Sequence, residues 1–268
     1  MRRTIVFLGT WFAAALLAAC VVVPALAAEN PWYGTWKMDV AKSHLTGQTI
    51  SYTKQANGLD QFSDGAMTYD FTANGIDYQV GGGSTESWAF AGPNTWKVTD
   101  KQKGTVTATT DVKLSPNCKT MTTVETGTRP DGSAIHEEET YTKVKSDGCL
   151  EGTWKSVKMS SNAPSKFIIS AGSAPDTWKW DIPDQKESVE GKTDGSDSPV
   201  TGPTAPSDLT VSFKMDGPRK VDVAVKLGGK TLSQGEDVLA ANGKTFTGTS
   251  WTPGKENEKA AAVYVKQK

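Results

Sequence analysis

The tetrapeptide Gly34-Thr35-Trp36-Lys37 occurs a second time, later in the chain, as Gly152-Thr153-Trp154-Lys155. Three further blocks recur in the same order. Their first copies are Asn74-Gly75-Ile76-Asp77, Asn117-Cys118-Lys119-Thr120 and Tyr141-Thr142-Lys143, and their second copies are Asp194-Gly195-Ser196-Asp197, Asn242-Gly243-Lys244-Thr245 and Tyr264-Val265-Lys266. The period is far longer than that of a solenoid unit, so each copy is long enough to be a small domain. We therefore predict two tandem repeats, at 28–147 and 148–268.

Each copy has the pattern of β-strands. The stretch 105–114 alternates, with Val106, Ala108, Val112 and Leu114 on one face. Asn-Gly and Asp-Gly pairs are frequent, and they supply the positive φ angles of tight hairpins. The only helix expected is one short turn at 39–43. The sequence thus predicts an all-β fold of two antiparallel up-and-down barrels, each with eight to ten short strands, because closure removes exposed strand edges.

A Gly-x-Trp opening on the first strand of a meandering barrel resembles the lipocalin and fatty-acid-binding superfamily, the calycins. With Ala41-Lys42-Ser43 and the later turn blocks, the first copy looks like a group of exported bacterial lipocalin-like proteins that share a G-T-W-K opening. The second copy lacks the Ala-Lys-Ser segment. The resemblance implies the barrel fold and export, and it brings no known active site. It also implies that Trp36 and Trp154 pack across one end of each barrel.

The N-terminus is typical of a targeting segment. Arg2 and Arg3 precede an apolar stretch at 5–23, and a small-x-small pattern ends at Ala27, so we expect a signal peptide at 1–27 that is cleaved after Ala27. Two alternatives stay open. Leu17-Ala18-Ala19-Cys20 resembles a lipobox, which would lipidate Cys20, and the apolar run is long enough for an uncleaved membrane anchor. Every alternative predicts export, to the periplasm or the medium, or as a membrane-anchored lipoprotein.

Composition restricts the partners. The chain has 29 Lys and Arg against 30 Asp and Glu, which argues against a basic surface for nucleic acid. Membrane contact is expected only through lipidation of Cys20 or an uncleaved leader. Only two histidines exist, so no metal site and no cofactor are expected. In the run from His136 to Glu139, alternate side chains point to opposite faces, which leaves too few ligands on one face for a metal.

Cys118 and Cys149 are predicted to form a disulfide bond. Cys118 stands where the second copy has Gly243 in an Asn-Gly turn, a position that favours glycine. In an antiparallel meander, the start of the strand after Cys118 lies beside the end of the following strand, which finishes near Cys149. Export supplies an oxidising compartment. Two free thiols are the alternative.

Tryptophans are the candidate ligand-binding residues. Later tryptophans could stack on a flat apolar ligand or a sugar ring, although packing in a small core is the commoner role of such residues. The four candidates are Trp88, Trp96, Trp178 and Trp180. Trp178 and Trp180 are two apart and share a strand face.

The sequence lacks the nucleophile elbow, the zinc-protease helix motif, the phosphate-binding loop and the dinucleotide fingerprint. No pair of carboxylates stands out as an acid and base. We therefore expect a non-enzymatic, exported, lipocalin-like protein that binds a small apolar or amphipathic ligand in a barrel cavity. The alternatives are a cell-envelope interaction module with filled barrels and, third, an enzyme acting on lipids or isoprenoids.

Overall fold

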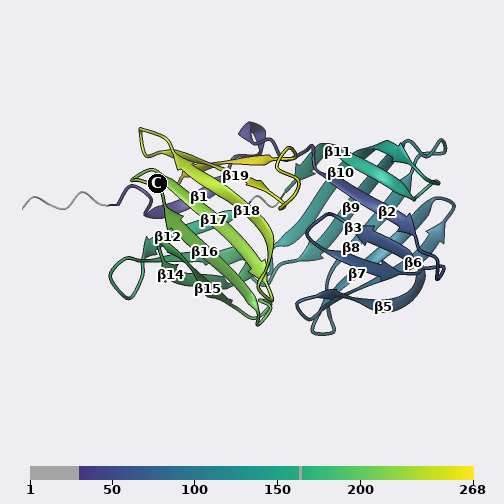
Figure 1. Ribbon diagram of the computed structural model, residues 1–268, viewed down its shortest axis with the longest axis horizontal. Coiled ribbons are helices and arrows are strands. Elements are labelled where there is room, and N and C mark those ends of the chain that lie inside the picture. The colour runs from purple at the N-terminus through teal and green to yellow at the C-terminus, as the bar shows by residue number, and fades with distance from the viewer. Residues whose placement is uncertain (1–29, 163–164) are drawn as a thin grey trace, which may run out of the picture. The chain divides into compact units, whose positions relative to one another are not determined.

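The computed structural model describes residues 30–162 and 165–268, and these residues form two ten-stranded antiparallel sheets (Figure 1). Everything below concerns the compact unit Pro31–Lys268. The predictions for the leader, cleavage after Ala27, lipidation at Cys20 and an uncleaved anchor, lie outside the described residues. Within the described residues, no helix has the length and apolar character needed to cross a membrane.

Sheet A is a closed barrel, and sheet B is open at one place. In order around sheet A, the strands are β1 (Gly34–Met38), β12 (Lys166–Ala171), β13 (Thr177–Ile182), β14 (Glu187–Lys192), β15 (Asp194–Thr201), β16 (Leu209–Met215), β17 (Lys220–Leu227), β18 (Lys230–Leu239), β19 (Thr245–Trp251) and β20 (Ala260–Lys266). In order across sheet B, they are β4 (Thr68–Phe71), β3 (Asp60–Ser63), β2 (Thr49–Lys54), β11 (Gly152–Ser161), β10 (Ala134–Ser146), β9 (Thr120–Thr128), β8 (Thr105–Leu114), β7 (Thr95–Gln102), β6 (Ser84–Gly92) and β5 (Asn74–Gly81). The all-β prediction and the strand number are confirmed.

Helix is confined to two single 3-10 turns in the described residues, η1 (Val40–Lys42) and η2 (Pro183–Gln185). The first lies where the sequence predicts a helical turn. Ser43 closes η1 by donating its hydroxyl to the carbonyl of Asp39 at 2.7 Å.

The two halves of the chain exchange their first strands. β1 belongs to the first repeat, yet it pairs with β12 and β20 of the second. β11 belongs to the second repeat, yet it pairs with β2 and β10 of the first. In Figure 1, the purple β1 lies among green and yellow strands, and the teal β11 lies beside β2. The predicted boundaries at 28–147 and 148–268 did not include this exchange. Since the two strands share the sequence Gly-Thr-Trp-Lys, each can fill the other's place.

The exchanged strands carry the same packing unit. Trp36 and Trp154 are both fully buried. Each indole Nε1 donates a 2.8 Å hydrogen bond to the carbonyl four residues earlier, that of Trp32 or Leu150. A lysine ammonium from the last strand of the other half covers each ring, which adds a cation–π contact. Both tryptophans are therefore core residues of the sheet that receives the strand.

The sheets differ in closure at equivalent places. Sheet B has no strand pairing between β4 and β5. In sheet A, the corresponding strands β14 and β15 pair only at Ser188 with Thr201 and at Val189 with Val200. The β14–β15 pairing, the shortest in the closed barrel, therefore lies at the position where sheet B is open.

β8 mostly follows the predicted alternation. Ala108, Val112 and Leu114 are buried in sheet B, but Val106 is 55% exposed. A register shift opposite β7, between Asp100 and Lys101, lies next to Val106. Val106 nevertheless borders the same internal space as Ala108 and Val112.

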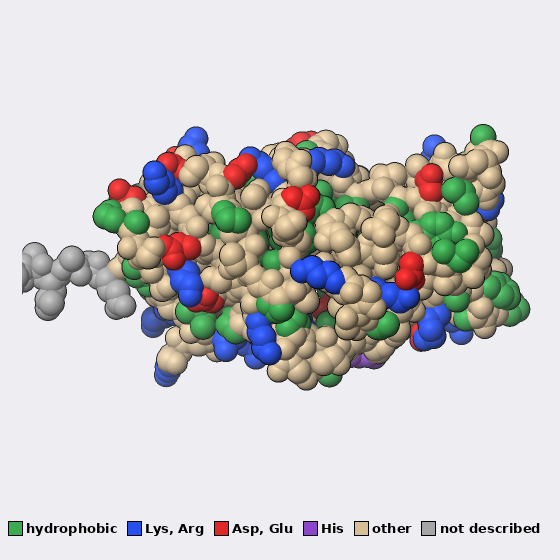
Figure 2. Space-filling model, turned by 90° about the horizontal axis from the view of Figure 1, so that it is seen from below, with side chains coloured by type: hydrophobic (Ala, Val, Ile, Leu, Met, Phe, Trp, Pro, Cys, Tyr) green, Lys and Arg blue, Asp and Glu red, His purple; other side chains and the backbone are tan. Residues whose placement is uncertain are grey.

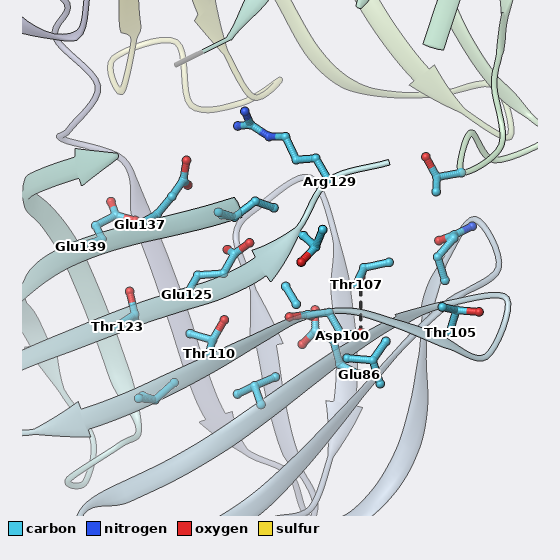
Figure 3. Close-up of a pocket in the computed structure, with 18 of the residues that line it drawn as sticks. Glu86, Asp100, Thr105, Thr107, Thr110, Thr123, Glu125, Arg129, Glu137 and Glu139 are labelled. Atoms are coloured by element: carbon cyan, nitrogen blue, oxygen red, sulfur yellow. Dashed lines mark hydrogen bonds between the residues drawn. The ribbon is translucent and has the colours of Figure 1, made fainter. Parts of the chain in front are cut away.

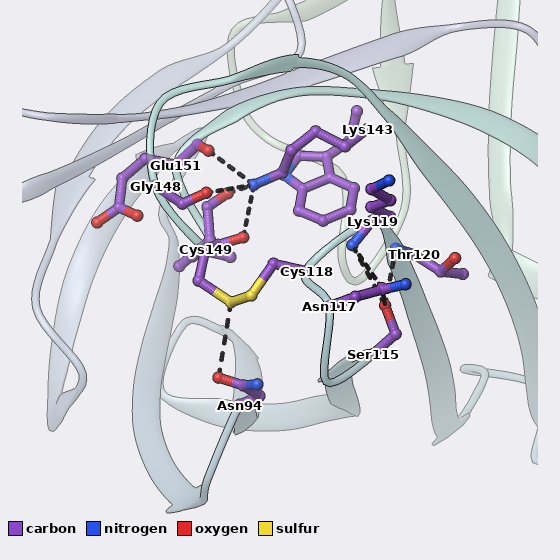
Figure 4. The surroundings of a disulfide bond; sticks show 12 residues. Asn94, Ser115, Asn117, Cys118, Lys119, Thr120, Lys143, Gly148, Cys149 and Glu151 are labelled. Carbon is purple, nitrogen blue, oxygen red and sulfur yellow. Dashed lines mark hydrogen bonds between the residues drawn. A yellow bond between two sulfur atoms is a disulfide. The ribbon is translucent and has the colours of Figure 1, made fainter.

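The predicted disulfide bond between Cys118 and Cys149 is confirmed, with Cα atoms 5.1 Å apart (Figure 4). Cys118 has a φ of 54°, and its counterpart Gly243 has a φ of 63°. A cysteine thus occupies a left-handed position that favours glycine, because it is bonded there. The bond joins the turn before β9 to the turn before β11.

Candidate ligand-binding cavity

A cavity of about 980 Å³ opens on the inner face of sheet B, and residues 185–186 and 203–204 of the second half also line it. Alternate residues of the strands of sheet B point inward, so one face of the sheet lines the space. The apolar part of the lining includes Tyr52, Phe62, Trp88, Val98 and Val112. The ring of Tyr52 lies 5.5 Å from that of Phe62 and 5.8 Å from that of Trp88, measured between centroids. This volume is within the range of sites that hold small molecules.

Five carboxylates line the same cavity (Figure 3). They are Glu86 on β6, Asp100 on β7, Glu125 on β9, and Glu137 and Glu139 on β10. Glu86 and Asp100 are direct cross-strand partners, and so are Glu125 and Glu137. Like charges in such positions are destabilising when both are ionised.

Three of the five carboxylates accept hydrogen bonds from neighbouring hydroxyls. The Tyr141 hydroxyl donates to Glu139 at 2.6 Å, and Ser161 donates to Glu137 at 2.7 Å. The Tyr69 hydroxyl donates to Glu86. Within the described part of the chain, no hydrogen bond reaches the carboxylate of Asp100 or Glu125.

Burial raises the pKa of several of these groups. Burial, with help from the charges of Glu86 and Glu125, raises the pKa of Asp100 to about 7. Burial likewise raises the pKa of Glu86, although its hydrogen bond from Tyr69 opposes the shift. The pKa of Glu125 is raised by burial and by Glu137, and Arg129 opposes this. The cavity therefore carries an acidic wall whose charge is poorly compensated by the protein itself.

Arg129 lines the cavity at the end of β9, and Figure 3 shows it beyond the acidic side chains. Its guanidinium lies 3.5 Å from the carboxylate of Asp184, so it forms an ion pair there. A smaller cavity of about 220 Å³ shares Glu86, Asp100, Gln102 and Thr107 with the large one. The Glu86–Asp100 pair thus borders both spaces.

The structure places the predicted tryptophan sites in different surroundings. Trp88 is 2% exposed and lines the large cavity. Trp96 is half-buried and packs against the core of sheet B without lining that cavity. Trp178 is buried in the core of sheet A. Trp180 is also in sheet A, where it lines a small cavity of about 200 Å³.

Sheet A is filled where sheet B is hollow. Its core contains stacked rings, including Trp180 against Phe213 and Phe246 against Tyr264. A cavity of about 200 Å³ inside it is lined by Asp237, among other residues. Burial raises the pKa of Asp237 to about 7. The two halves of the repeat therefore differ in the space that they enclose.

Sequence reasoning missed the acidic wall. It correctly placed His136 and Glu138 on one face of β10, and both are exposed. The opposite face carries Glu137 and Glu139, which point into the cavity rather than into solvent. The signal that could have found them is the alternation counted from Tyr141, since Glu139 and Glu137 are two and four residues before that buried ring.

No group of three potential metal-ligating side chains occurs among the described residues. On the face shown in Figure 2, basic and acidic side chains are interspersed, and hydrophobic side chains form small separate groups. No family model matches the chain, and no curated protein or solved structure is significantly similar to it. The cavity is therefore the feature on which a function can be argued.

Proposed function

We propose that this protein is an exported binding protein that holds a small amphipathic molecule in the cavity of sheet B. The observation that carries the proposal is a single space of about 980 Å³ with aromatic and aliphatic side chains on one part and carboxylates on another. Apolar lining with a few polar groups is the common design of small-molecule sites. The two barrel-shaped sheets are compatible with a lipocalin-like binding fold.

The proposed role is non-catalytic. The described residues that line the cavity include no serine, cysteine or histidine, so the nucleophile and base pairs of most hydrolases have no counterpart there, and we assign its carboxylates to ligand binding. Export is part of the proposal, and the disulfide between Cys118 and Cys149 supports it, because such bonds persist in oxidising compartments. Kinship with the calycins is likewise proposed, and it is supported by the meandering order of the strands.

A second role is favoured for sheet A alone. Its small cavity leaves little room for a ligand, so we assign it the role of the filled barrel in an envelope interaction module. This assignment does not conflict with ligand binding in sheet B.

Calorimetric titration with decanol, a neutral amphipathic probe, tests the proposal. Wild-type protein is expected to bind one decanol per chain. Thr110 lines the cavity, so Thr110→Trp should fill it and weaken binding at least tenfold. Its neighbour Thr109 lies outside the lining, so Thr109→Trp is the matched control and should bind decanol as wild type does. Equal effects of the two variants would overturn the proposal, and so would absence of binding both by decanol and by charged amphiphiles of the same chain length.

A further inference from the structure

The fold does not require the acidic pairs inside sheet B. In the internal repeat, Ser87-Trp88 corresponds to Ser212-Phe213, and both pairs of residues are buried. The Glu86–Asp100 pair therefore corresponds to the directly paired Val211 and Val225 of sheet A. The cross-strand pair Met121–Tyr141 of the first repeat corresponds to Phe246–Tyr264 of the second. Counted along the strands from these pairs, Glu125 and Glu137 correspond to Ser250 and Ala260. The second half forms the same strands with neutral side chains at all four places.

Among the residues that the structure describes, the cavity presents one further buried polar group without a partner, the hydroxyl of Tyr52. Tyr52 is only 3% exposed and lines the cavity, and its hydroxyl has no hydrogen-bond partner among the described residues. After burial, the negative charge of Glu86 raises the pKa of both Tyr52 and Tyr69, so these hydroxyls lie near that carboxylate. A buried hydroxyl without a partner is costly, which indicates that a ligand atom or water completes it.

We propose that the molecule held in sheet B is an amphipathic organic cation, a protonated amine carried on an apolar chain. This inference rests on the proposed function, and it names the class of ligand. The cross-strand pairs Glu86–Asp100 and Glu125–Glu137 place four carboxylates around one space, and an ammonium with three donors satisfies such acceptors. A bound cation also removes the repulsion within each pair.

The rest of the cavity fits the apolar part of such a ligand. Trp88, Phe62 and Val112 provide an apolar surface beside the carboxylates. The rings of Trp88 and Tyr52 also line the cavity, and aromatic rings attract cations. A bare metal ion fits less well, since the volume far exceeds that of an ion and no cluster of three metal-ligating side chains occurs among the described residues.

Burial supports the same assignment. Burial and the charges of Glu86 and Glu125 raise the pKa of Asp100, so its negative charge is held at a cost beside the cavity. A cation beside this carboxylate would favour its ionised form. An anionic ligand would instead meet five carboxylates against two cations, Lys186 and Arg129, and Arg129 is already paired to Asp184.

Three probes of equal chain length separate the possibilities by calorimetric titration at pH 8: decylamine, decanol and decanoate. An alkyl amine has a pKa near that of lysine, about 10.4, and is protonated under these conditions. Decylamine is expected to bind at least tenfold more tightly than decanol, and decanoate more weakly than decanol.

Two variants locate the effect. Glu86→Val with Asp100→Val copies the residues of sheet A, and it should reduce the preference for decylamine over decanol to less than threefold while decanol still binds. The isosteric pair Glu86→Gln with Asp100→Asn gives the same readout if the valine variant does not fold. Asp111→Asn is the control, because its side chain is 59% exposed and pairs with Lys97 on the outside.

The outcomes separate the two proposals. If decanol or decanoate binds wild type as tightly as decylamine, the cation inference is overturned and the proposed function stands. If none of the three probes binds, the proposed function itself fails. If decylamine is preferred but the paired variants keep that preference, the acidic pairs are not its source and the inference is again overturned.

Discussion

Trp36 packs edge to face against Phe246, with ring centroids 5.0 Å apart, although the two residues lie in different halves of the chain. The contact exists because β1 is placed between β12 and β20. Trp154 is placed likewise in sheet B, between β2 and β10. Each core is thus completed by an indole from the other repeat, and neither half of the chain has a complete barrel of its own in this structure.

Strand exchange predicts which strands are destabilised when each indole is removed. Trp36→Ala should destabilise the protein by about 3–5 kcal/mol, because a fully buried indole is lost. Hydrogen exchange followed by mass spectrometry should show faster exchange mainly in β12 and β20. Trp154→Ala should accelerate exchange mainly in β2 and β10.

Trp96→Ala serves as a comparison, since Trp96 is half-buried and lies on a strand that is not exchanged. If Trp36→Ala instead accelerates hydrogen exchange in β2 and β10, each repeat retains its own first strand, and the proposed strand exchange is refuted.

The disulfide bond should contribute substantially to stability. Cys118 and Cys149 are 31 residues apart in sequence, and a loop of that size corresponds to about 3–4 kcal/mol in the chain-entropy model. Cys118→Ser with Cys149→Ser should lower the free energy of unfolding by that amount. Urea denaturation followed by circular dichroism measures it.

Because Cys118 has a left-handed φ, glycine and serine at this position can be compared in the absence of the disulfide. Cys118→Gly with Cys149→Ser should be about 1 kcal/mol more stable than the double serine variant, because glycine tolerates this conformation. Equal stability of the two variants would show that the turn imposes no conformational cost.

Much of the fold could be predicted from sequence, because its causes are local. Alternation, turn pairs and the repeated Gly-Thr-Trp-Lys block each report on a few neighbouring residues, and they predicted strands, meander and disulfide. The strand exchange could not be predicted in this way. β1 and β11 present nearly the same side chains, so the sequence does not distinguish which sheet receives which strand.

The candidate site was harder to predict for a related reason. The acidic residues of the cavity look like ordinary solvent-facing residues of a half-exposed strand, since Glu and Asp are rarely buried. Only the register shows that Glu86 is opposite Asp100, and that both point inward. The tryptophans drew attention by their type, yet only Trp88 among the four candidates lines the large cavity.

The lysines above the two buried indoles should differ in their contribution. Lys143 donates to the carbonyls of Gly148 and Cys149 at 2.7 Å and of Glu151 at 3.0 Å (Figure 4). Lys266 donates to the carbonyl of Pro31 at 2.8 Å. Lys143→Met should therefore cost about 2–3 kcal/mol in unfolding free energy, and Lys266→Met about 1 kcal/mol.

Urea denaturation of the two variants gives both values under one condition. Equal losses would mean that the contact with the indole ring, which both lysines share, outweighs the carbonyl contacts.

Asp237 should make stability depend on pH. Burial raises its pKa to about 7, against about 3.9 for an unfolded aspartate. The folded state therefore binds this proton more tightly, so the stabilising effect is complete below pH 4 and is lost as the pH rises to 7. Asp237→Asn removes the ionisation. Its melting temperature should exceed that of wild type by about 5 °C at pH 8 and should match it at pH 4.

Glu138→Gln is the control for Asp237→Asn, because Glu138 is exposed on the outer face of β10. This variant should follow wild type at both pH values. If Asp237→Asn raises the melting temperature equally at pH 4 and pH 8, removal of the buried charge is not the cause of the increase. In that case the amide would be stabilising through a new hydrogen bond, for which Tyr264 and Ser250 line the same small cavity.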